Sequence, residues 1–304
     1  MDMEGLRAGR RGSVARAITM AENDTDGAEE MLRAIYPETG GSDIVGVTGP
    51  AGAGKSSLIN GLSMEMARSG DRPAVLAVDP TSHITGGAIL GDRVRMGTST
   101  DSGVYIRSIA SRGATGALSD SLRNSIRILE YAGFDPIIIE SVGAGQTEVD
   151  ISNIADVTVV VFNPHTGDSI QTIKAGITEI GDVCVINKAD LPGSSALYDA
   201  VRDYIGESDR NPAVLKTSVK ENAGIGELAS TIRERLRAAA SSAPQRRARR
   251  LEAETKDIVL SHLRRRLDTM FAPGGSAHHI MESVREGGTD PYEAAGRICR
   301  SLGE

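Results

Sequence analysis

The sequence is poor in aromatic residues. Tryptophan is absent, and Phe and Tyr together bring the aromatic content to only 3% of 304 residues. Proteins that hold single-stranded nucleic acid need exposed aromatic side chains on which the bases stack, so this composition argues against that class. The core must instead be built from Val, Ile, Leu, Ala and Met.

Cysteine is almost as scarce. Cys184 lies in an apolar, strand-like run and Cys299 in a helix-like stretch near the end of the chain. Neither has a partner at the spacing of a metal site, and the adjacent His278 and His279 cannot share a helix face. We therefore expect buried, reduced thiols and no zinc site.

Long apolar runs and a basic charge are also missing. No hydrophobic run approaches the roughly 20 residues that span a membrane. The basic N-terminus lacks the apolar segment of a signal peptide. The formal net charge is −7, which disfavours general binding to nucleic acid or to anionic membranes. We expect a cytoplasmic protein without a nucleic-acid or membrane partner.

Alternating strand and helix patterns fill the middle of the chain. Residues 1–40 have helical spacing that is interrupted at Asn23–Asp26, and β-branched runs begin at residue 43. Almost wholly apolar runs are typical of strands buried on both faces of a parallel sheet. Their alternation with helical segments predicts a doubly wound α/β fold. The expected strands are 44–48, 74–78, 105–107, 136–141, 157–162, 183–187 and 214–217, and the expected helices are 55–69, 117–132, 169–179, 196–205 and 225–239.

The last part of the chain changes character again. Gln245–Arg250 opens a charged helix that should reach about Met270, and a breaker at 272–275 precedes two short helices. The arginine run favours a solvated helix face, or an arm packing on a partner, over a nucleic-acid patch. We therefore expect an N-terminal helical extension (1–40), an α/β domain (41–240) and a C-terminal helical arm (241–304).

A phosphate-binding motif follows the first expected strand and opens the first expected helix of the sheet region. The stretch GPAGAGKSS matches GxxxxGK[ST] in the context that this motif requires. Its backbone N–H groups and the helix N-terminus favour phosphate, its lysine neutralises the β- and γ-phosphates, and its serine binds Mg²⁺. The expected nucleotide-binding residues are Gly49, Pro50, Ala51, Gly52, Ala53, Gly54, Lys55, Ser56 and Ser57.

A guanine-reading motif follows a later strand. In Asn187-Lys188-Ala189-Asp190, the carboxylate of Asp190 can accept hydrogen bonds from guanine N1–H and the exocyclic amine. Adenine offers no such donor pair, so the site discriminates between the bases. Lys188 would lie along the base and Asn187 would brace the loops. Ser218, Val219 and Lys220 fit the loop that contacts guanine O6, although serine after a strand is also common as a helix cap.

Acidic residues at strand ends predict a metal site beside the phosphates. Asp79 and Glu140 end strands at the edge where ligands bind in open α/β sheets. Glu140-xx-Gly143 keeps the DxxG spacing of GTPases with a glutamate in place of the aspartate. Asp92 lies in a long glycine-rich loop, and we predict that this loop is a switch segment whose Asp92 carboxylate lies near Mg²⁺. Gln146 is either a water-orienting residue or an ordinary polar loop residue. Catalysis would be mainly electrostatic, with Lys55, Glu140, Asp92 and Gln146 as its residues.

Several longer segments resemble the MeaB/ArgK/MMAA family of P-loop GTPases. They are AVDPTSHITGGAILGDRVRM, AGFDPIIIESVGAGQTEVDI, HTGDSIQTIKAG and VINKAD. Members of this family are chaperones of adenosylcobalamin-dependent acyl-CoA mutases, typically methylmalonyl-CoA mutase. The resemblance covers essentially the whole chain. It implies a GTPase that gates cofactor loading and protects or reactivates a mutase, with the C-terminal arm forming a homodimer.

The resemblance also assigns individual residues. It implies that Ser56 and Asp92 bind Mg²⁺ and that Asp79 and Glu140 lie around the metal and the γ-phosphate. It implies further that Asp168, Gln171 and Lys174 lie in the switch segment that communicates with the mutase. The chain departs from the family at Ser82-His83-Ile84, at Gly113–Ala117, and at Asn163-Pro164-His165, which replaces a more apolar lead-in to that switch. These departures leave the identity of the client open.

Two other functions are compatible with parts of the sequence. A metallochaperone GTPase for a nickel or zinc enzyme belongs to the same wider group, but such proteins usually have Cys- or His-rich motifs. A kinase tied to amino-acid transport is the other alternative, although the NKAD motif favours GTP and no phosphoacceptor site is visible.

Overall fold

The computed structural model describes residues 1–79, 103–110, 117–141, 151–165, 180–205 and 211–302. Contacts divide the chain into two compact units, Met1–Ala248 and Arg249–Glu304. The N-terminal helices therefore share a unit with the sheet, and the boundaries that the sequence predicts at residues 40 and 240 remain predictions.

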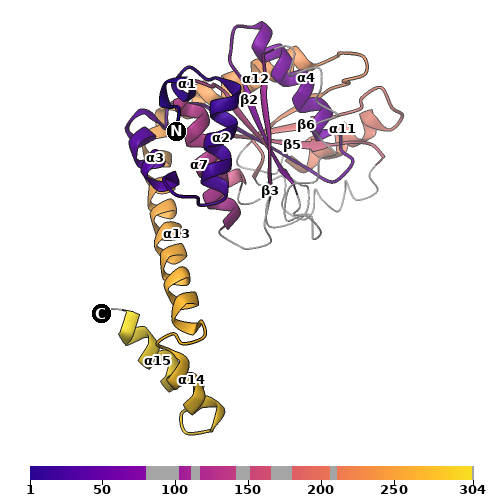
Figure 1. The fold of residues 1–304 in the computed structure, drawn as a ribbon. Helices are drawn as coiled ribbons and strands as arrows, with labels where there is room; N and C mark the ends of the chain where they lie inside the picture. Colours follow the sequence, from indigo (N-terminus) through magenta and orange to yellow (C-terminus); the bar gives the residue numbers. More distant parts are fainter. Residues whose placement is uncertain (80–102, 111–116, 142–150, 166–179, 206–210, 303–304) are drawn as a thin grey trace. The chain divides into compact units, whose positions relative to one another are not determined.

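Within the described residues, seven strands form one sheet in the order β3-β2-β4-β1-β5-β6-β7, and all neighbours are parallel (Figure 1). This arrangement confirms the predicted fold class. The third strand runs three residues past the predicted end at Arg107, because it pairs with its neighbour up to Ala110. The bounds are β1 Ile44–Thr48, β2 Ala74–Asp79, β3 Tyr105–Ala110, β4 Ile137–Glu140, β5 Val157–Phe162, β6 Val183–Ile186 and β7 Ala213–Lys216.

Helices cover both faces of the sheet (Figure 1). The hydrophobic cluster on one face contains Leu58 of α4 and Leu228 of α12, packed against alternate strand residues such as Val159. The other alternate set packs against α2 and α7, and farther along the sheet against α11. The helices of this unit are α1 Met3–Arg7, α2 Arg11–Glu22, α3 Ala28–Ile35, α4 Lys55–Arg68, α7 Ala117–Tyr131, α11 Ser194–Ile205 and α12 Ile225–Ala239, with 3₁₀ turns η1 Tyr36–Glu38 and η3 Ala240–Ser242.

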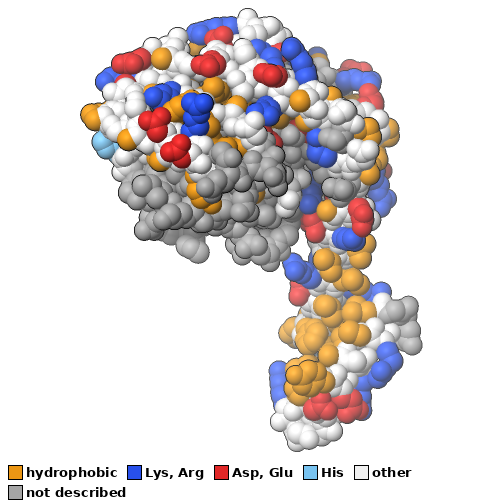
Figure 2. All heavy atoms as spheres, turned by 180° about the vertical axis from the view of Figure 1, so that it is seen from behind, with side chains coloured by type: hydrophobic (Ala, Val, Ile, Leu, Met, Phe, Trp, Pro, Cys, Tyr) orange, Lys and Arg blue, Asp and Glu red, His pale blue; other side chains and the backbone are white. Residues whose placement is uncertain are grey.

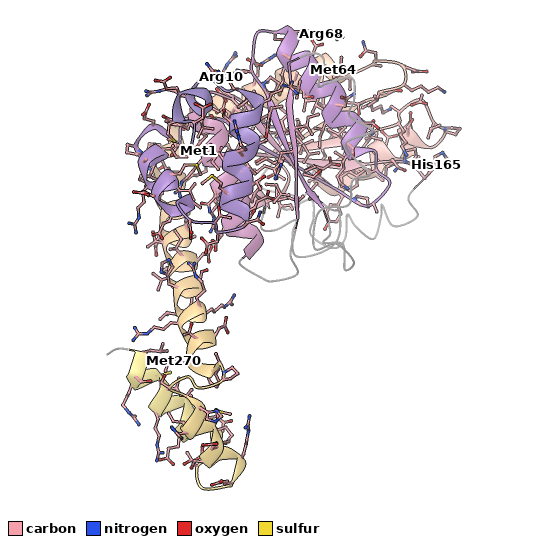
Figure 3. The ribbon with its side chains drawn as sticks, in the orientation of Figure 1. Met1, Arg10, Met64, Arg68, His165 and Met270 are labelled. Atoms are coloured by element: carbon pink, nitrogen blue, oxygen red, sulfur yellow. The ribbon has the colours of Figure 1, made fainter. Side chains whose placement is uncertain are left out.

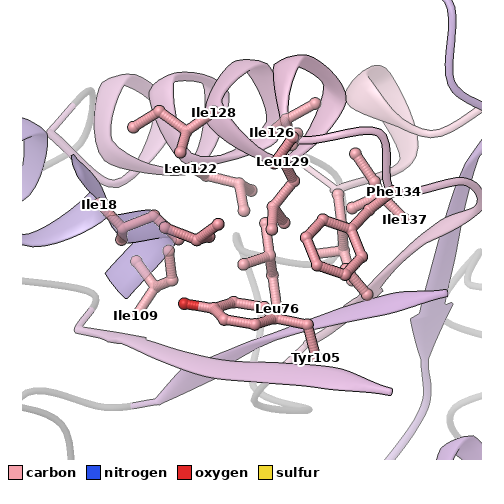
Figure 4. Close-up of a cluster of buried hydrophobic side chains, with 14 of the residues drawn as sticks. Ile18, Leu76, Tyr105, Ile109, Leu122, Ile126, Ile128, Leu129, Phe134 and Ile137 are labelled. Carbon is pink, nitrogen blue, oxygen red and sulfur yellow. The ribbon is translucent and has the colours of Figure 1, made fainter. Parts of the chain in front are cut away.

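The core under α7 is closed by aromatic and aliphatic side chains from several elements (Figure 4). The rings of Tyr105 and Phe134 lie 5.4 Å apart between their centroids, and Leu122 and Leu129 of α7 are buried at this cluster. Ile18 of α2 is fully buried in the same cluster. The N-terminal helices thus complete the hydrophobic core of the sheet domain. They are three helices where the sequence predicts two.

Aspartates brace the amino ends of the strands. Asp156, just before β5, accepts a hydrogen bond from Ile44 N at 3.0 Å, and Asp182, just before β6, accepts one from Thr158 N at 2.8 Å. Asp135 accepts a third from Asp43 N at 2.9 Å. Each carboxylate satisfies the N–H of a neighbouring strand or of its approach, which would otherwise lack a partner at the sheet edge.

The arginine run contributes to the same edge. Arg246 Nη2 lies 3.4 Å from Asp156 Oδ1, and Arg247 Nη2 donates to Thr39 O at 3.0 Å. These contacts belong to the first unit, at the start of α13, which runs from Ala243 to Phe271. Part of the run therefore anchors the start of the long helix to the sheet domain.

The second unit contains the rest of α13 together with α14 (His278–Arg285) and α15 (Pro291–Leu302). Asp290 Oδ1 accepts hydrogen bonds from Tyr292 N and Glu293 N, which caps α15. The small core of this unit is formed by Met270, Ala277 and Ile298, with Leu267, Ile280 and Leu302 packed against it.

The two cysteines differ in burial. Cys184 is fully buried in β6, and burial raises the pKa of its thiol to about 12, so it stays protonated. The prediction that Cys299 is also buried is wrong, because Cys299 is exposed. It follows Ile298, which faces the small core, and successive helical residues point about 100° apart.

Candidate nucleotide-binding site

The expected phosphate loop leaves β1, a central strand of the sheet, and ends at the first residue of α4. Two glycines are required by its path. A side chain at Gly49 would place its Cβ 2.2 Å from Val161 O of β5, and Gly54 has a φ of +89° with Asn187 Nδ2 in the space that a Cβ would occupy. Only glycine allows so close an approach to the neighbouring strand ends.

The lysine of the motif is bound to its own loop. Lys55 is buried, and its Nζ donates to Gly49 O at 2.8 Å and to Pro50 O at 3.2 Å. Ala51, Gly52 and Ser57 are exposed, and Ser56 is half-buried on the first turn of α4. A cation at the N-terminus of a 14-residue helix, beside an exposed glycine-rich loop, is the arrangement that binds phosphate.

The expected guanine loop follows β6 and is joined directly to the phosphate loop. Asn187 is 2% exposed, and its Nδ2 donates to Ala53 O at 3.0 Å while its Oδ1 accepts from Thr217 Oγ1 at 3.2 Å. Lys188 has a φ of +56°, and its Nζ donates to Gly52 O at 3.0 Å. The structure therefore places the two motifs, more than 130 residues apart in the chain, in contact at one edge of the sheet.

Asp190 is held by the loop that follows β7. Ser218 Oγ donates to Asp190 Oδ1 at 2.7 Å, and Lys220 Nζ lies 4.0 Å from Asp190 Oδ2. The hydrogen bond from Ser218, followed by the backbone N–H of Asp190 and by the charges of Lys220 and Lys188, holds the pKa of Asp190 below its usual value. Asp190 is therefore a fixed carboxylate acceptor at neutral pH. Val219, between the two contacting residues, packs against the core.

The proposed metal ligands meet across two elements. Ser56 Oγ donates to Glu140 Oε1 at 2.6 Å, and Glu140, the last residue of β4, is 5% exposed. A serine hydroxyl beside a carboxylate at the start of the phosphate-binding helix fits Mg²⁺, which prefers hard oxygen ligands. Asp79 is the last residue of β2, the strand next to β4, and its backbone reaches the same edge.

Several predicted residues lie outside the described part of the chain. These include the metal-site residue Asp92 and the water-orienting candidate Gln146. The switch residues Asp168, Gln171 and Lys174 lie outside it too. Their roles remain predictions. Within the described ranges, no group of three or more His, Cys, Asp or Glu side chains is arranged to hold a metal ion.

None of the described helices combines the length and the apolar character that crossing a bilayer requires.

Asn163 also belongs to this site, although its sequence context predicted no role for it. Asn163 directly follows β5, is 1% exposed, and donates from Nδ2 to Gly52 O at 2.8 Å. The sequence gives one indication of this role, because Asn163 is a polar residue directly after the apolar run VTVVVF, at the edge of the sheet where the nucleotide motifs lie. Its contact with the phosphate loop spans 111 positions in the chain and is visible only in the structure.

Known proteins share this sequence and fold. The sequence profile of the family described as methylmalonyl-CoA mutase-associated GTPase MeaB matches residues 14–271. A Pyrococcus abyssi protein named as a GTPase is 42% identical over 310 residues, covering 99% of this chain and 95% of the relative. GTPase ArgK from Escherichia coli is 34% identical over 279 residues, covering 85% of this chain and 84% of the relative.

A solved structure, that of a LAO/AO transport system kinase, has the same fold. It superposes with a TM-score of 0.68 at 24% identity, covering 99% of this chain and 96% of the other. The family and the two relatives are named as GTPases, as the phosphate and guanine motifs of the sequence predict. The chain therefore belongs to the MeaB family of methylmalonyl-CoA mutase-associated GTPases.

Proposed function

We propose that the site binds GTP with Mg²⁺ held by Ser56 and Glu140, and that Asp79 and Asp92 complete the surroundings of the metal and the γ-phosphate. The hydrogen bond between Ser56 and Glu140 supports this proposal, because it brings two oxygen ligands together at the start of the phosphate-binding helix. Mg²⁺ would neutralise part of the charge that develops on the phosphates. Lys55 would supply the cation from the protein, and Asp190 would select guanine.

We propose further that this GTPase is a chaperone of an adenosylcobalamin-dependent acyl-CoA mutase, with methylmalonyl-CoA mutase as the first candidate. GTP hydrolysis would gate cofactor loading and protect or reactivate the mutase. The observation that carries this proposal is the match of residues 14–271 to a family described as associated with that mutase.

A binding experiment tests the client. The purified protein would be mixed with methylmalonyl-CoA mutase in the presence of GDP or of a non-hydrolysable GTP analogue, and complexes would be separated by size. We expect a complex whose stability depends on the nucleotide. Lys55→Ala, which should lose nucleotide binding, is the control and should abolish that dependence. Absence of a complex with this mutase and with related acyl-CoA mutases would reject the proposal.

Hydrolysis should be slow without the partner. Among the residues that the structure describes, Lys55, Asn163, Asn187 and Lys188 donate side-chain hydrogen bonds to the phosphate loop. A partner that completes the site, or adds a cation to it, accelerates GTPases of this general class by orders of magnitude. A turnover rate that is high for the protein alone, and unchanged by the mutase, would contradict this expectation.

The second unit supports a proposed homodimer. Leu260 and Leu263 of α13 are 53% and 40% exposed, and they continue at three- and four-residue spacing the stripe whose later members, Leu267 and Met270, pack in the small core. Ile258 and Val259 are exposed beside them, and Figure 2 shows hydrophobic side chains gathered on this part of the chain. A matching stripe of a second copy would cover them. Leu260→Asp with Leu263→Asp should convert a dimer into a monomer in sedimentation, with GTP binding retained.

A further inference from the structure

Asn163 is buried at the nucleotide edge of the sheet, and both the nitrogen and the oxygen of its side-chain amide form hydrogen bonds. Its Nδ2 donates to Gly52 O at 2.8 Å, and its Oδ1 accepts from His165 N at 2.8 Å. His165, labelled in Figure 3, is the last described residue of this segment. One side chain thus joins the tip of the phosphate loop to the turn that leaves β5. A polar group at 1% exposure is stabilised by such bonds and is costly to leave without them.

The Gly52 carbonyl is one of five in the phosphate loop that accept hydrogen bonds from side chains. Lys55 Nζ takes those of Gly49 and Pro50, and Asn187 Nδ2 takes those of Ala53 and Gly54. Gly52 O accepts from Asn163 Nδ2 and also from Lys188 Nζ, at 3.0 Å. These side chains come from the motif itself and from the ends of β5 and β6.

The direction of these carbonyls determines what the loop offers to phosphate. In a trans peptide the C=O and the N–H point in opposite directions, so holding a carbonyl toward the strand ends turns the following N–H away from them. A carbonyl that rotated toward a bound phosphate would place the partial negative charge of its oxygen against the negative charge of the phosphate. Gly52 has a φ of +78° and no neighbour within 4 Å of an added Cβ, so local packing does little to fix it. Side-chain donors must do so.

We propose that Asn163 is a positioning residue for the nucleotide phosphates, acting through the Gly52 carbonyl. It lies outside both nucleotide motifs. The inference rests on the proposed GTP site and extends it with a third element, the end of β5, that shapes the phosphate loop. Loss of the Asn163 bond leaves Gly52 O with one donor, the half-buried Lys188, whose bond is exposed to solvent and whose long side chain holds the carbonyl less firmly.

The experiment compares ligands that differ only in phosphate. Dissociation constants of guanosine, GDP and GTP are measured for wild type, Asn163→Leu, and Asn163→Asp, which keeps the acceptor for His165 N and loses the donor. Thr158→Val, a buried isosteric change at the other end of β5, is the matched control, and thermal unfolding without ligand reports folding. We expect GDP and GTP to bind at least about fivefold more weakly to both Asn163 variants, with guanosine unchanged, because one hydrogen bond is worth about 1 kcal/mol.

The outcomes separate this inference from the proposed function. If folded Asn163 variants bind GDP and GTP within twofold of wild type, or lose guanosine binding equally, Asn163 does not position the phosphates. If wild type itself binds neither GDP nor GTP, the proposed GTP site fails. Should Asn163→Leu not fold, Asn163→Ala, which removes the donor without adding a charge beside the phosphates, decides the question.

Discussion

Ser56 Oγ donates a 2.6 Å hydrogen bond to Glu140 Oε1, although the two residues are 84 positions apart in the chain. One lies on the first turn of α4 and the other ends β4, so the sheet topology brings a hydroxyl and a carboxylate to one point. Oxygen ligands at that point are what the proposed Mg²⁺ site requires.

Glu140→Gln should therefore impair hydrolysis more than folding. The amide keeps the size of the side chain but removes its charge. We expect turnover to fall on the order of 100-fold and the Mg²⁺ concentration for half-maximal activity to rise. Steady-state GTPase assays across a magnesium titration measure both. Glu130→Gln, at a half-buried carboxylate bonded to Gly40 N, serves as the control. An unchanged magnesium requirement would argue against Glu140 as a metal-site residue.

Asp190→Asn should reduce selection for the guanine 2-amino group. The carboxylate accepts from that amine in the proposed site, whereas an asparagine replaces one acceptor by a donor. The preference for GTP over inosine triphosphate, which lacks the amine, should fall about tenfold or more. Competition binding with the two nucleotides measures it. Equal preference in wild type and variant would show that Asp190 does not read the base.

Ser218→Ala should move the acid limit of GTP binding. The Ser218 hydrogen bond is the largest cause that lowers the pKa of Asp190. With a lowered pKa, the carboxylate persists through mildly acidic pH, and its contribution is lost only as the pH falls through that pKa. Removal of the hydroxyl returns the pKa toward 3.8 and shifts the loss of affinity to higher pH. Dissociation constants measured as the pH is lowered through 3.8 should separate the two curves, which would coincide if Ser218 had no such influence.

Asp156→Ala should destabilise the sheet domain without changing nucleotide affinity. Asp156 accepts from Ile44 N, the first residue of β1, at the edge opposite the phosphate loop. Loss of the acceptor should lower the free energy of unfolding by about 1–3 kcal/mol. Asp156→Asn retains an acceptor and should cost less. Urea unfolding and GTP titration test the pair, and equal losses in both variants would contradict a role through the Ile44 bond.

Glu130→Gln should raise stability at neutral pH. Burial is the largest cause that raises the pKa of Glu130 above 4.5, outweighing the hydrogen bonds from Gly40 and Ser42. A raised folded-state pKa means that stability from this group is present at low pH and is lost as the pH rises through that pKa. The glutamine still accepts from Gly40 N but carries no buried charge. Thermal unfolding from pH 4 to pH 7 should show a gain that grows with pH, and a loss at pH 7 would refute the argument.

Much of the fold was predictable because its signals are local. The strands Ile44–Thr48 and Val157–Phe162 are apolar runs bounded by polar residues, and both have the predicted bounds. The strand at Tyr105–Ala110 was predicted too short, because polar Arg107 and Ser108 interrupt the apolar pattern. Arg107 is tolerated there since it forms an ion pair with Glu22 of α2. The sequence around Arg107 does not indicate this contact, because its partner lies 85 positions away in the chain.

The candidate site, like the fold, was predictable from the sequence only where its signals are local. The contiguous motifs at Gly49–Ser57 and Asn187–Asp190 identify their chemistry from sequence alone. The contact of Asn163 with Gly52 depends on the neighbouring positions of β1 and β5 in the sheet. The shared role of the aspartates before the strands could not be predicted from the sequence. Each of them bonds to a strand that becomes its neighbour only after folding.

Those aspartates also bear on how an anion reaches the protein. A net charge of −7 would slow the approach of a nucleoside triphosphate if it were spread evenly. However, Asp43, Asp135, Asp156 and Asp182 are concentrated at the amino edge of the sheet, whereas Lys55, Lys188 and the N-terminus of α4 lie at the carboxyl edge. Glu140 and Asp190 also lie at the carboxyl edge but are bonded to Ser56 and Ser218. The cations therefore give the phosphate loop a local field that favours an incoming triphosphate, and the association rate should fall as ionic strength rises.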